Sequence, residues 1–262
     1  MCGQVKEASR HVEAVTKALA ILECFDAEPV RTLKTIREIT GLNKSRVIRL
    51  CGTLVANGYL DYEPGPHQYK LGSRILRLGK AYERSNSLIS VARPVLRDLA
   101  DQTGESATLY VVDGLKRLCL ATEEGTYGIR YTILEGQQLE LYAGSGGKVL
   151  LAFGPEEIRR KILTKDCLKR LTAKTFTDVK RLEREFDVIR RRGYATSFGE
   201  RDADAASLAA PIYNHDATVC AAVAIGGPIN RFTPRHNARH LKILLAFARR
   251  ISQKLGYEGQ EL

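Results

Sequence analysis

Apolar and polar positions in the first 72 residues follow helical spacing and then the period of a β-hairpin. A first amphipathic helix is predicted over 15–25, where apolar residues recur every three to four positions at Val15, Ala18, Leu19 and Leu22. A second helix, LKTIREITG, places Ile36 and Ile39 on one face and Gly41 at its end. Asn43 is positioned to cap a third helix, whose predicted buried side carries Val47, Leu50, Cys51, Leu54 and Val55.

The other side of the third helix is polar and basic. It carries Lys44, Ser45, Arg46, Arg49 and Thr53. Residues 31–50 contain six basic side chains and one acidic side chain, a crowding that favours an anionic partner. The run that follows, LDYEPGPHQYKLG, predicts a strand, a turn and a second strand, with His67 at the tip of the hairpin.

Three helices followed by a hairpin wing predict a winged helix-turn-helix DNA-binding domain over residues 1–72. The cations and hydroxyls of its third helix suit the major groove, so we expect base contacts from Ser45, Arg46, Arg49 and Thr53. Phosphate or minor-groove contacts are expected from Lys44, His67 and Lys70. Short helices with a basic face also occur in proteins that bind no DNA, and the local charge excess is what favours DNA here.

Residues 73–87 predict a linker helix. Its apolar stripe of Ile75, Leu78 and Tyr82, with Leu76 at the edge, would be exposed if the helix stood alone. A self-complementary contact with a second copy would cover this stripe, so a homo-oligomer is expected.

Residues 88–262 predict an α+β domain built on one central, mostly antiparallel sheet. A first helix is expected over 89–103. Asp113-Gly114 and Glu135-Gly136 are expected at the turns of two hairpins, and a final strand pair lies in SLAAPIYNHDATVCAAVAIGG. Further helices are expected over 147–153, from Pro155, from Asp178 to Gly193 and over 234–255.

Composition adds limits rather than a function. The chain has 262 residues, a net charge of +11 and a pI near 9.4, which agrees with a polyanionic partner. Its six cysteines have no metal-ligand spacing and no secretory signal precedes them, so we expect reduced thiols in a cytoplasmic protein. No apolar run approaches the 18 residues of a membrane span. His236 and His240 lie four apart but lack a third ligand, so we interpret them as part of a basic solvated face and expect neither metal nor cofactor.

The order of several motifs resembles the IclR-type bacterial transcriptional regulators over almost the whole chain. These motifs are VTKALAILECF, the run LKTIREITGLNKSRVIRLCGTLVANGYLDYEPGPHQYKLG, GSGGKVLLAF, RRRGYATSFGERDADAASLAAPIYN and AIGGPINRFT. The resemblance implies a winged-helix DNA-binding domain, a dimerising linker helix and a GAF-like domain that binds a small effector, commonly a carboxylate or an aromatic metabolite. It also implies a dimer or tetramer that regulates an operator in double-stranded DNA, and we expect a repressor.

The resemblance also implies a set of effector-binding positions. They are Tyr131, Leu139, Ser145, Gly146, Ser197, Ala205, Ser207, Ala224 and Gly226. The GSGG run could expose backbone amides at a helix N-terminus, which suits a carboxylate, although such a run can also be a simple turn. Glu140, Asp204 and Ser207 depart from the family pattern. The nearby run Glu200-Arg201-Asp202 makes this side of the pocket unusually charged, and Arg201 is a candidate counter-ion for an acidic ligand.

Two other classes of function are open, an enzyme and an architectural nucleic-acid binder. GSGGK fails the phosphate-loop pattern because Tyr142 and Val149 stand where Gly and Ser or Thr are needed. The nucleophile-elbow pattern fails because Ala143 stands two residues before Ser145, so no catalytic residues are expected. An architectural nucleic-acid binder that ignores small molecules is the second alternative.

Overall fold

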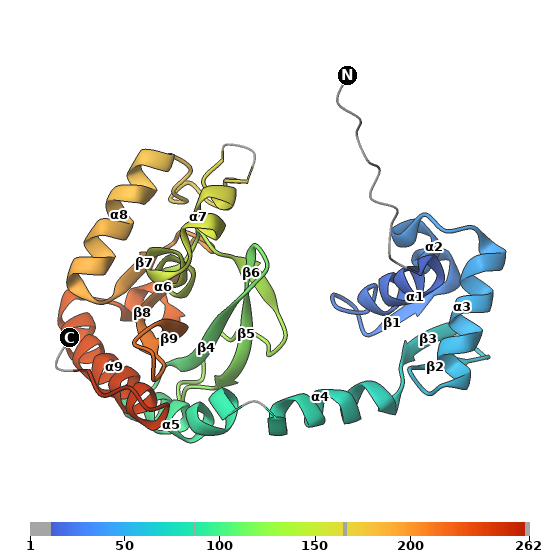
Figure 1. Ribbon diagram of the computed structural model, residues 1–262, viewed down its shortest axis with the longest axis horizontal. Helices are drawn as coiled ribbons and strands as arrows, with labels where there is room; N and C mark the ends of the chain where they lie inside the picture. The colour runs from blue at the N-terminus through green and yellow to red at the C-terminus, as the bar shows by residue number, and fades with distance from the viewer. Residues whose placement is uncertain (1–11, 86, 165–166, 260–262) are drawn as a thin grey trace. The chain divides into compact units, whose positions relative to one another are not determined.

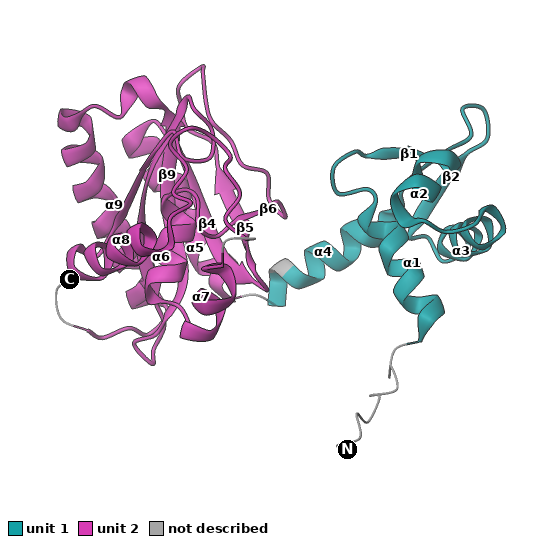
Figure 2. Cartoon of the chain, turned by 90° about the horizontal axis from the view of Figure 1, so that it is seen from above, with its two compact units in different colours: residues 1–85 teal, residues 86–262 magenta. Residues whose placement is uncertain are grey.

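The computed structural model describes residues 12–85, 87–164 and 167–259. The chain divides after Ser85 into two compact units, residues 1–85 and 86–262 (Figures 1 and 2). The helix expected as a linker belongs to the first unit. Within the described residues, no helix is both long enough and apolar enough to cross a membrane. The five cysteines in this part of the chain are free thiols, and Cys2 lies outside it.

The first unit is a winged helix-turn-helix (Figure 1). Its helices are α1 (Glu13–Glu23), α2 (Leu33–Thr40), α3 (Lys44–Ala56) and α4 (Ser73–Ser85). Strands β2 (Leu60–Glu63) and β3 (Gln68–Leu71) form the wing, and a short strand that we did not predict, β1 (Val30–Thr32), pairs with the other edge of β3. The core joins the first three helices to the wing through Ile21, Cys24, Phe25, Ile36, Val47, Cys51, Leu54 and Leu60.

Local chemistry sets the helix boundaries of this unit. The Asn43 side chain accepts a hydrogen bond from the Arg46 amide at 2.9 Å, which confirms the predicted cap of α3. Gly41 ends α2 with φ +67°, a backbone conformation that side chains with a Cβ rarely adopt. Thr32 caps the start of α2 by accepting from the Thr35 amide at 3.2 Å.

Two predicted apolar faces in this unit are wrong in detail. Helix α1 buries Ile21, whereas Val15 and Leu19 are 55% and 53% exposed. Helix α2 buries Ile36, whereas Ile39 is 54% exposed. Three positions turn a helix by about 300°, so Ile39 points about 60° away from Ile36 around the helix axis. Because α2 packs on the core through a narrow strip, Ile39 lies outside that strip.

The second unit is an α+β domain with one antiparallel sheet in the order β6-β5-β4-β9-β8-β7. The strands are β4 (Ser106–Asp113), β5 (Lys116–Glu123), β6 (Gln138–Glu140), β7 (Ala195–Phe198), β8 (Ala205–Tyr213) and β9 (Val219–Pro228). Helices α5 (Ser87–Thr103) and α9 (Pro234–Lys254) cover one face of the sheet (Figure 1). Helices α6 (Ser145–Phe153) and α8 (Val179–Arg192) cover the other, with α7 (Glu156–Ile162) following α6.

Several boundaries in this unit differ from those predicted. Pro94 lies inside α5 without ending it, and α6 begins at Ser145 rather than Gly147. The run before Glu135-Gly136 is not a strand, so the expected second hairpin is wrong; the run after this turn is β6, which pairs with β5. Strand β7 was not predicted, and Pro155 is the N-cap of α7 rather than its first-turn residue. The Asp113-Gly114 hairpin, the final strand pair and the helix from Asp178 to Gly193 are confirmed. Thr233 caps α9 by accepting a hydrogen bond from the His236 amide.

The two isoleucines of α2 provide a matched stability test. We predict that Ile36→Ala lowers the free energy of unfolding by about 2 to 5 kcal/mol, because it opens a cavity in the core. Ile39→Ala removes the same atoms from an exposed position and should change it by less than about 0.5 kcal/mol. Urea denaturation of the full chain, followed by circular dichroism, measures both. Equal effects of the two substitutions would contradict the burial assignment.

Candidate functional site

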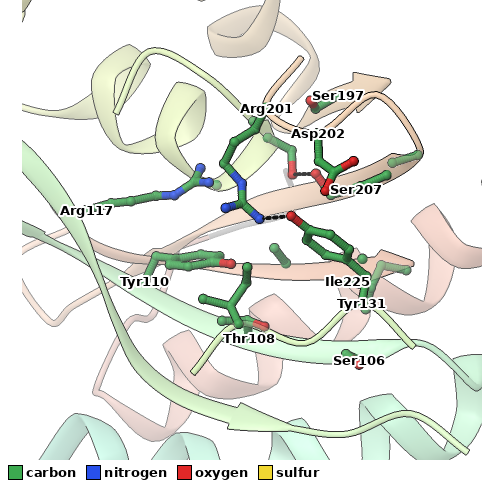
Figure 3. A pocket seen from close by; sticks show the side chains of 18 residues that line it. Ser106, Thr108, Tyr110, Arg117, Tyr131, Ser197, Arg201, Asp202, Ser207 and Ile225 are labelled. Carbon is green, nitrogen blue, oxygen red and sulfur yellow. Dashed lines mark hydrogen bonds between the residues drawn. The ribbon is translucent and has the colours of Figure 1, made fainter. Parts of the chain in front are cut away.

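A cavity of about 50 Å³ lies in the second unit, where the N-terminus of α6 faces the sheet (Figure 3). Strands β4, β5, β8 and β9 contribute to its walls. The segment before β6 adds Tyr131 and Ile133, and the loop between β7 and β8 adds Arg201 and Asp202. The cavity therefore joins segments that are far apart in the sequence.

Nine of the ten expected effector positions line this cavity. Ser145 and Gly146 come from α6, Ser197 from β7, and the rest from β8, β9 and the two loops. The exception is Leu139, which is only 8% exposed and packs in the core around α6 and α8. The expectation that Leu139 is an effector-binding position is therefore corrected, because Leu139 does not line the cavity. Among the lining residues that sequence reasoning missed are Thr108, Tyr110 and Arg117.

Glycines allow the first turn of α6 to approach the sheet closely. Gly144, the N-cap, has φ +91°. A Cβ on Gly146 would lie 2.6 Å from the Tyr110 ring, and one on Gly147 would lie 2.3 Å from the carbonyl oxygen of Leu141. The Ser145 hydroxyl donates to Ser207 Oγ at 2.7 Å, which ties α6 to β8. The GSGG run is thus a packed helix start rather than a free turn.

A buried ion pair occupies part of this helix start. Lys148 is 1% exposed, and its Nζ donates to Glu200 Oε1 at 2.5 Å and to the Thr196 carbonyl at 2.8 Å. The Gly144 amide donates to Glu200 Oε2 at 3.2 Å, so the chain's own carboxylate already takes this amide. The next three amides, of Ser145, Gly146 and Gly147, have no partner within the helix, since the first turn of an α-helix leaves its N–H groups unpaired.

Arg117 is a buried cation in the cavity wall. It comes from β5, is 3% exposed, and stacks its guanidinium 4.7 Å from the centre of the Tyr110 ring (Figure 3). Burial lowers the pKa of Arg117 and raises that of Tyr110. The period of two along a strand places Arg117 on the same face as the buried Cys119, and this parity was the signal that sequence reasoning missed.

Arg201 and Tyr131 meet across the cavity. The Arg201 guanidinium donates to the Tyr131 hydroxyl and lies 5.2 Å from the centre of its ring (Figure 3). Burial raises the pKa of Tyr131 above its ordinary value, so the phenol stays protonated at neutral pH. This contact joins the loop after β7 to the segment before β6 and narrows the cavity between them.

A second ion pair supports the segment that carries Tyr131. Arg231 donates from Nε and Nη2 to both oxygens of Glu105 at 2.6 Å, and from Nη1 to the Ile129 carbonyl at 3.0 Å. Its guanidinium also stacks 4.5 Å from the centre of the Tyr127 ring. Glu105 is 1% exposed and directly precedes β4, so this fork anchors the segment to the edge of the cavity.

The seven expected DNA contacts lie on α3 and the wing. Lys44, Ser45, Arg46, Arg49 and Thr53 are all exposed on α3. His67 forms the turn of the wing with φ +53°, and its Nδ1 lies 2.7 Å from the Tyr62 hydroxyl. Lys70 donates to Glu63 at 2.6 Å, and Arg46 lies 3.4 Å from Glu13. Such exposed pairs cost little to break when a phosphate replaces the carboxylate.

The two histidines four apart on α9 differ in burial. His236 is exposed, whereas His240 is 5% exposed and packs edge-to-face with Phe232, so the expectation that both belong to a solvated face is wrong for His240. Position 240 turns toward the sheet together with Leu244 and Phe247, which follow it at helical spacing. Within residues 12–85, 87–164 and 167–259, no group of three potential ligands could hold a metal ion.

A winged helix-turn-helix and a separate α+β unit with a polar cavity define a two-part DNA-binding regulator. Residues 14–64 match the model of the IclR helix-turn-helix domain, and residues 80–253 match that of the bacterial transcriptional regulator IclR C-terminal domain. The chain belongs to the IclR family of bacterial transcriptional regulators.

Individual relatives agree with this assignment. The chain is 29% identical to the HTH-type transcriptional regulator KipR of Bacillus subtilis over 245 residues, which cover 94% of this chain and 98% of KipR. It is 30% identical to the p-hydroxybenzoate hydroxylase transcriptional activator of Acinetobacter baylyi, covering 86% and 85% of the two chains. A crystal structure of an IclR homologue from Microbacterium hydrocarbonoxydans complexed with 4-hydroxybenzoate has a TM-score of 0.81 and 25% identity, covering 92% and 98%.

The Glu105–Arg231 fork should matter more for stability than an exposed pair. We predict that Arg231→Met lowers the free energy of unfolding by about 3 to 5 kcal/mol, because it leaves a buried carboxylate without its partner. Arg250→Met breaks an ion pair with Asp98 whose side chains are both nearly half exposed, and should cost less than about 1 kcal/mol. Thermal melting of both variants provides the comparison. A similar loss in both would contradict the anchoring role of Arg231.

Proposed function

We propose that a small organic acid, aliphatic or aromatic, binds in the cavity at the N-terminus of α6 and changes the affinity of the regulator for its operator. The observation that carries this proposal is the helix N-terminus itself, which faces a cavity lined by hydroxyl groups and arginines. Backbone N–H groups and the helix dipole favour an anion at this position. The Microbacterium homologue with bound 4-hydroxybenzoate supports an aromatic acid as one candidate.

On the DNA side, we propose that Ser45, Arg46, Arg49 and Thr53 read base edges in the major groove. Their exposure on one side of a capped, well-packed helix supports this role. Lys44, His67 and Lys70 would contact phosphates or the neighbouring minor groove. The wing and the start of α3 hold these three side chains exposed.

A homo-oligomer, either a dimer or a tetramer, is part of this proposal. Leu76 and Leu78 of α4 are 65% and 53% exposed, as the sequence pattern led us to expect. Covering them with α4 of a second copy would bring two reading helices to a two-fold operator. Coupling between acid and DNA of about 1 to 3 kcal/mol would then change operator affinity by about 5- to 150-fold.

We expect repression rather than activation. Expression of a reporter gene from the regulated promoter, measured with and without the regulator, tests this expectation.

An enzyme is the first alternative function. The relatives of this chain are transcriptional regulators, which counts against an enzyme. An architectural binder without an effector is the second rival. A ligand-dependent rise in melting temperature would argue against the second, since only a ligand that binds the folded state stabilises it.

Arg49→Ala tests the reading surface. We predict a loss of about 1 to 3 kcal/mol in operator binding together with weaker preference for the operator over random DNA, because a guanidinium can bond two atoms of one base edge. Arg184→Ala, an exposed arginine of α8, removes the same charge from the other unit and should leave operator affinity unchanged. Gel shifts with DNA upstream of the gene, at about 150 mM salt with competitor DNA, compare the two. Unchanged affinity of Arg49→Ala would exclude Arg49 from the reading surface.

The same gel shift tests the effector when it is repeated with a panel of aliphatic and aromatic acids. An acid that alters a discrete shifted band supports the proposed regulator and names the class of its ligand. A specific band that no acid alters would favour the architectural binder instead.

A further inference from the structure

Arg117 carries a buried positive charge that forms no ion pair with any residue that the structure describes. Its Nε and Nη1 atoms are buried and donate a hydrogen bond to no residue within 12–85, 87–164 or 167–259. No acidic side chain in this described part of the chain forms an ion pair with it, and its close polar contact is the face of the Tyr110 ring. A buried charge without a partner is costly, so such an arrangement calls for an explanation.

A comparison with Lys148 makes the difference clear. Both cations are at most 3% exposed and both lie beside the first turn of α6. Lys148 has Glu200 and a backbone carbonyl as hydrogen-bond acceptors. The carboxylate charge of Glu200 acts on Arg117 and favours its charged form, but the two oxygens of Glu200 already accept from Lys148 and from the Gly144 amide. One buried cation is therefore paired, and the other is not.

The position of Arg117 increases the excess of positive charge. A Cβ built on Gly144 would lie 3.0 Å from both Nη1 and Nη2, so the guanidinium lies against the N-cap of α6. A helix N-terminus carries about half a positive charge, and a cation beside it is unfavourable. Figure 3 shows the guanidinium pointing from β5 toward the cavity, above Tyr110 and beside Arg201. The positive charge of Arg117 and the positive end of the α6 dipole therefore meet at one cavity.

The charges of the lining indicate how many negative charges are missing. Among the described residues, the charged side chains that line the cavity are Arg117, Arg201 and Asp202. The formal charges of these three side chains sum to one positive charge. The cavity of about 50 Å³ has room for a carboxylate and a few further atoms, since one water needs about 10 to 15 Å³ on this scale. A larger acid would have to displace the Arg201–Tyr131 contact.

We propose that Arg117 is the anchor for the acid group of the effector, and that this effector binds as a monoanion. The anchor rests on the proposed function, because it specifies how the acid is held in the same cavity. The carboxylate would accept from the guanidinium of Arg117 and from the open amides at the start of α6. Bound acid would then supply the counter-charge that the folded chain lacks.

Arg117→Met tests the anchor by removing the charge while keeping most of the volume. The probes are acetate, benzoate and 4-hydroxybenzoate, each compared with its uncharged amide, and the readouts are calorimetric binding and melting temperature of the full chain. The unsubstituted protein should bind at least one acid and not its amide. Arg117→Met should bind that acid about 10- to 100-fold more weakly, the factor expected for a lost charged hydrogen bond.

The free protein gives a second, ligand-independent readout. Arg117→Met should melt at the same temperature as the unsubstituted protein or higher, because an unpaired buried charge has been removed. Lys148→Met is the matched control and should melt lower, because it leaves Glu200 without its partner. A fall in melting temperature for Arg117→Met as large as that for Lys148→Met would overturn the inference and make Arg117 a structural residue.

The remaining outcomes separate this inference from the proposed function. If Arg117→Met binds the acid as tightly as the unsubstituted protein, Arg117 is not the anchor, whereas the proposed acid effector stands. Absence of binding for every acid in the unsubstituted protein would contradict both the anchor and the proposed acid effector. Succinate should bind no more tightly than its monomethyl ester, and the reverse order would contradict a monoanion.

Discussion

The buried ion pair between Lys148 and Glu200 is the interaction on which the cavity depends. It joins α6 to the loop after β7, and Glu200 also fixes the Gly144 amide at the helix start. The Thr172 and Thr175 hydroxyls donate to the carbonyls of Gly199 and Glu200 at 2.6 and 2.7 Å, which hold the same loop from the other side. Removing one member of a buried pair typically costs about 3 to 5 kcal/mol. The loop that carries Arg201 and Asp202 thus has a fixed place at the cavity, as a binding site for a small ligand requires.

Around this fixed frame, the cavity has one internally satisfied side and one unsatisfied side. On one side, Lys148 pairs with Glu200, and Ser145 donates a hydrogen bond to Ser207. The Nε and Nη1 atoms of Arg117 have no hydrogen-bond partner among the described residues, and the first-turn amides of α6 have none within the helix. Binding sites commonly combine a rigid frame with polar groups that only the ligand completes. The helix-turn-helix unit shows the same division, since α3 buries Val47, Cys51 and Leu54 and leaves its cations exposed.

Features set by neighbouring residues were predictable, and features set by distant ones were not. Asn43, Asp178 and Thr233 cap helices through side chains that bond an amide three residues ahead, so a short sequence contains the whole interaction. The short strands β1 and β7 depend on partners about 40 and 10 residues away, and their own sequences carry little strand signal. The resemblance to a family located most of the cavity wall, yet it misplaced Leu139 and missed Arg117. The missing counter-charge of Arg117 is a property of the folded chain, which no local pattern encodes.

The central claim is that acid binding and operator binding are coupled through one protein. Isothermal titration of the acid into the protein, first alone and then saturated with operator DNA, tests this claim most directly. Coupling is reciprocal, so the acid's Kd must change by the same factor by which the acid changes the Kd for DNA, which we expect to be about 5- to 150-fold. An acid Kd that is identical with and without operator DNA would contradict the account.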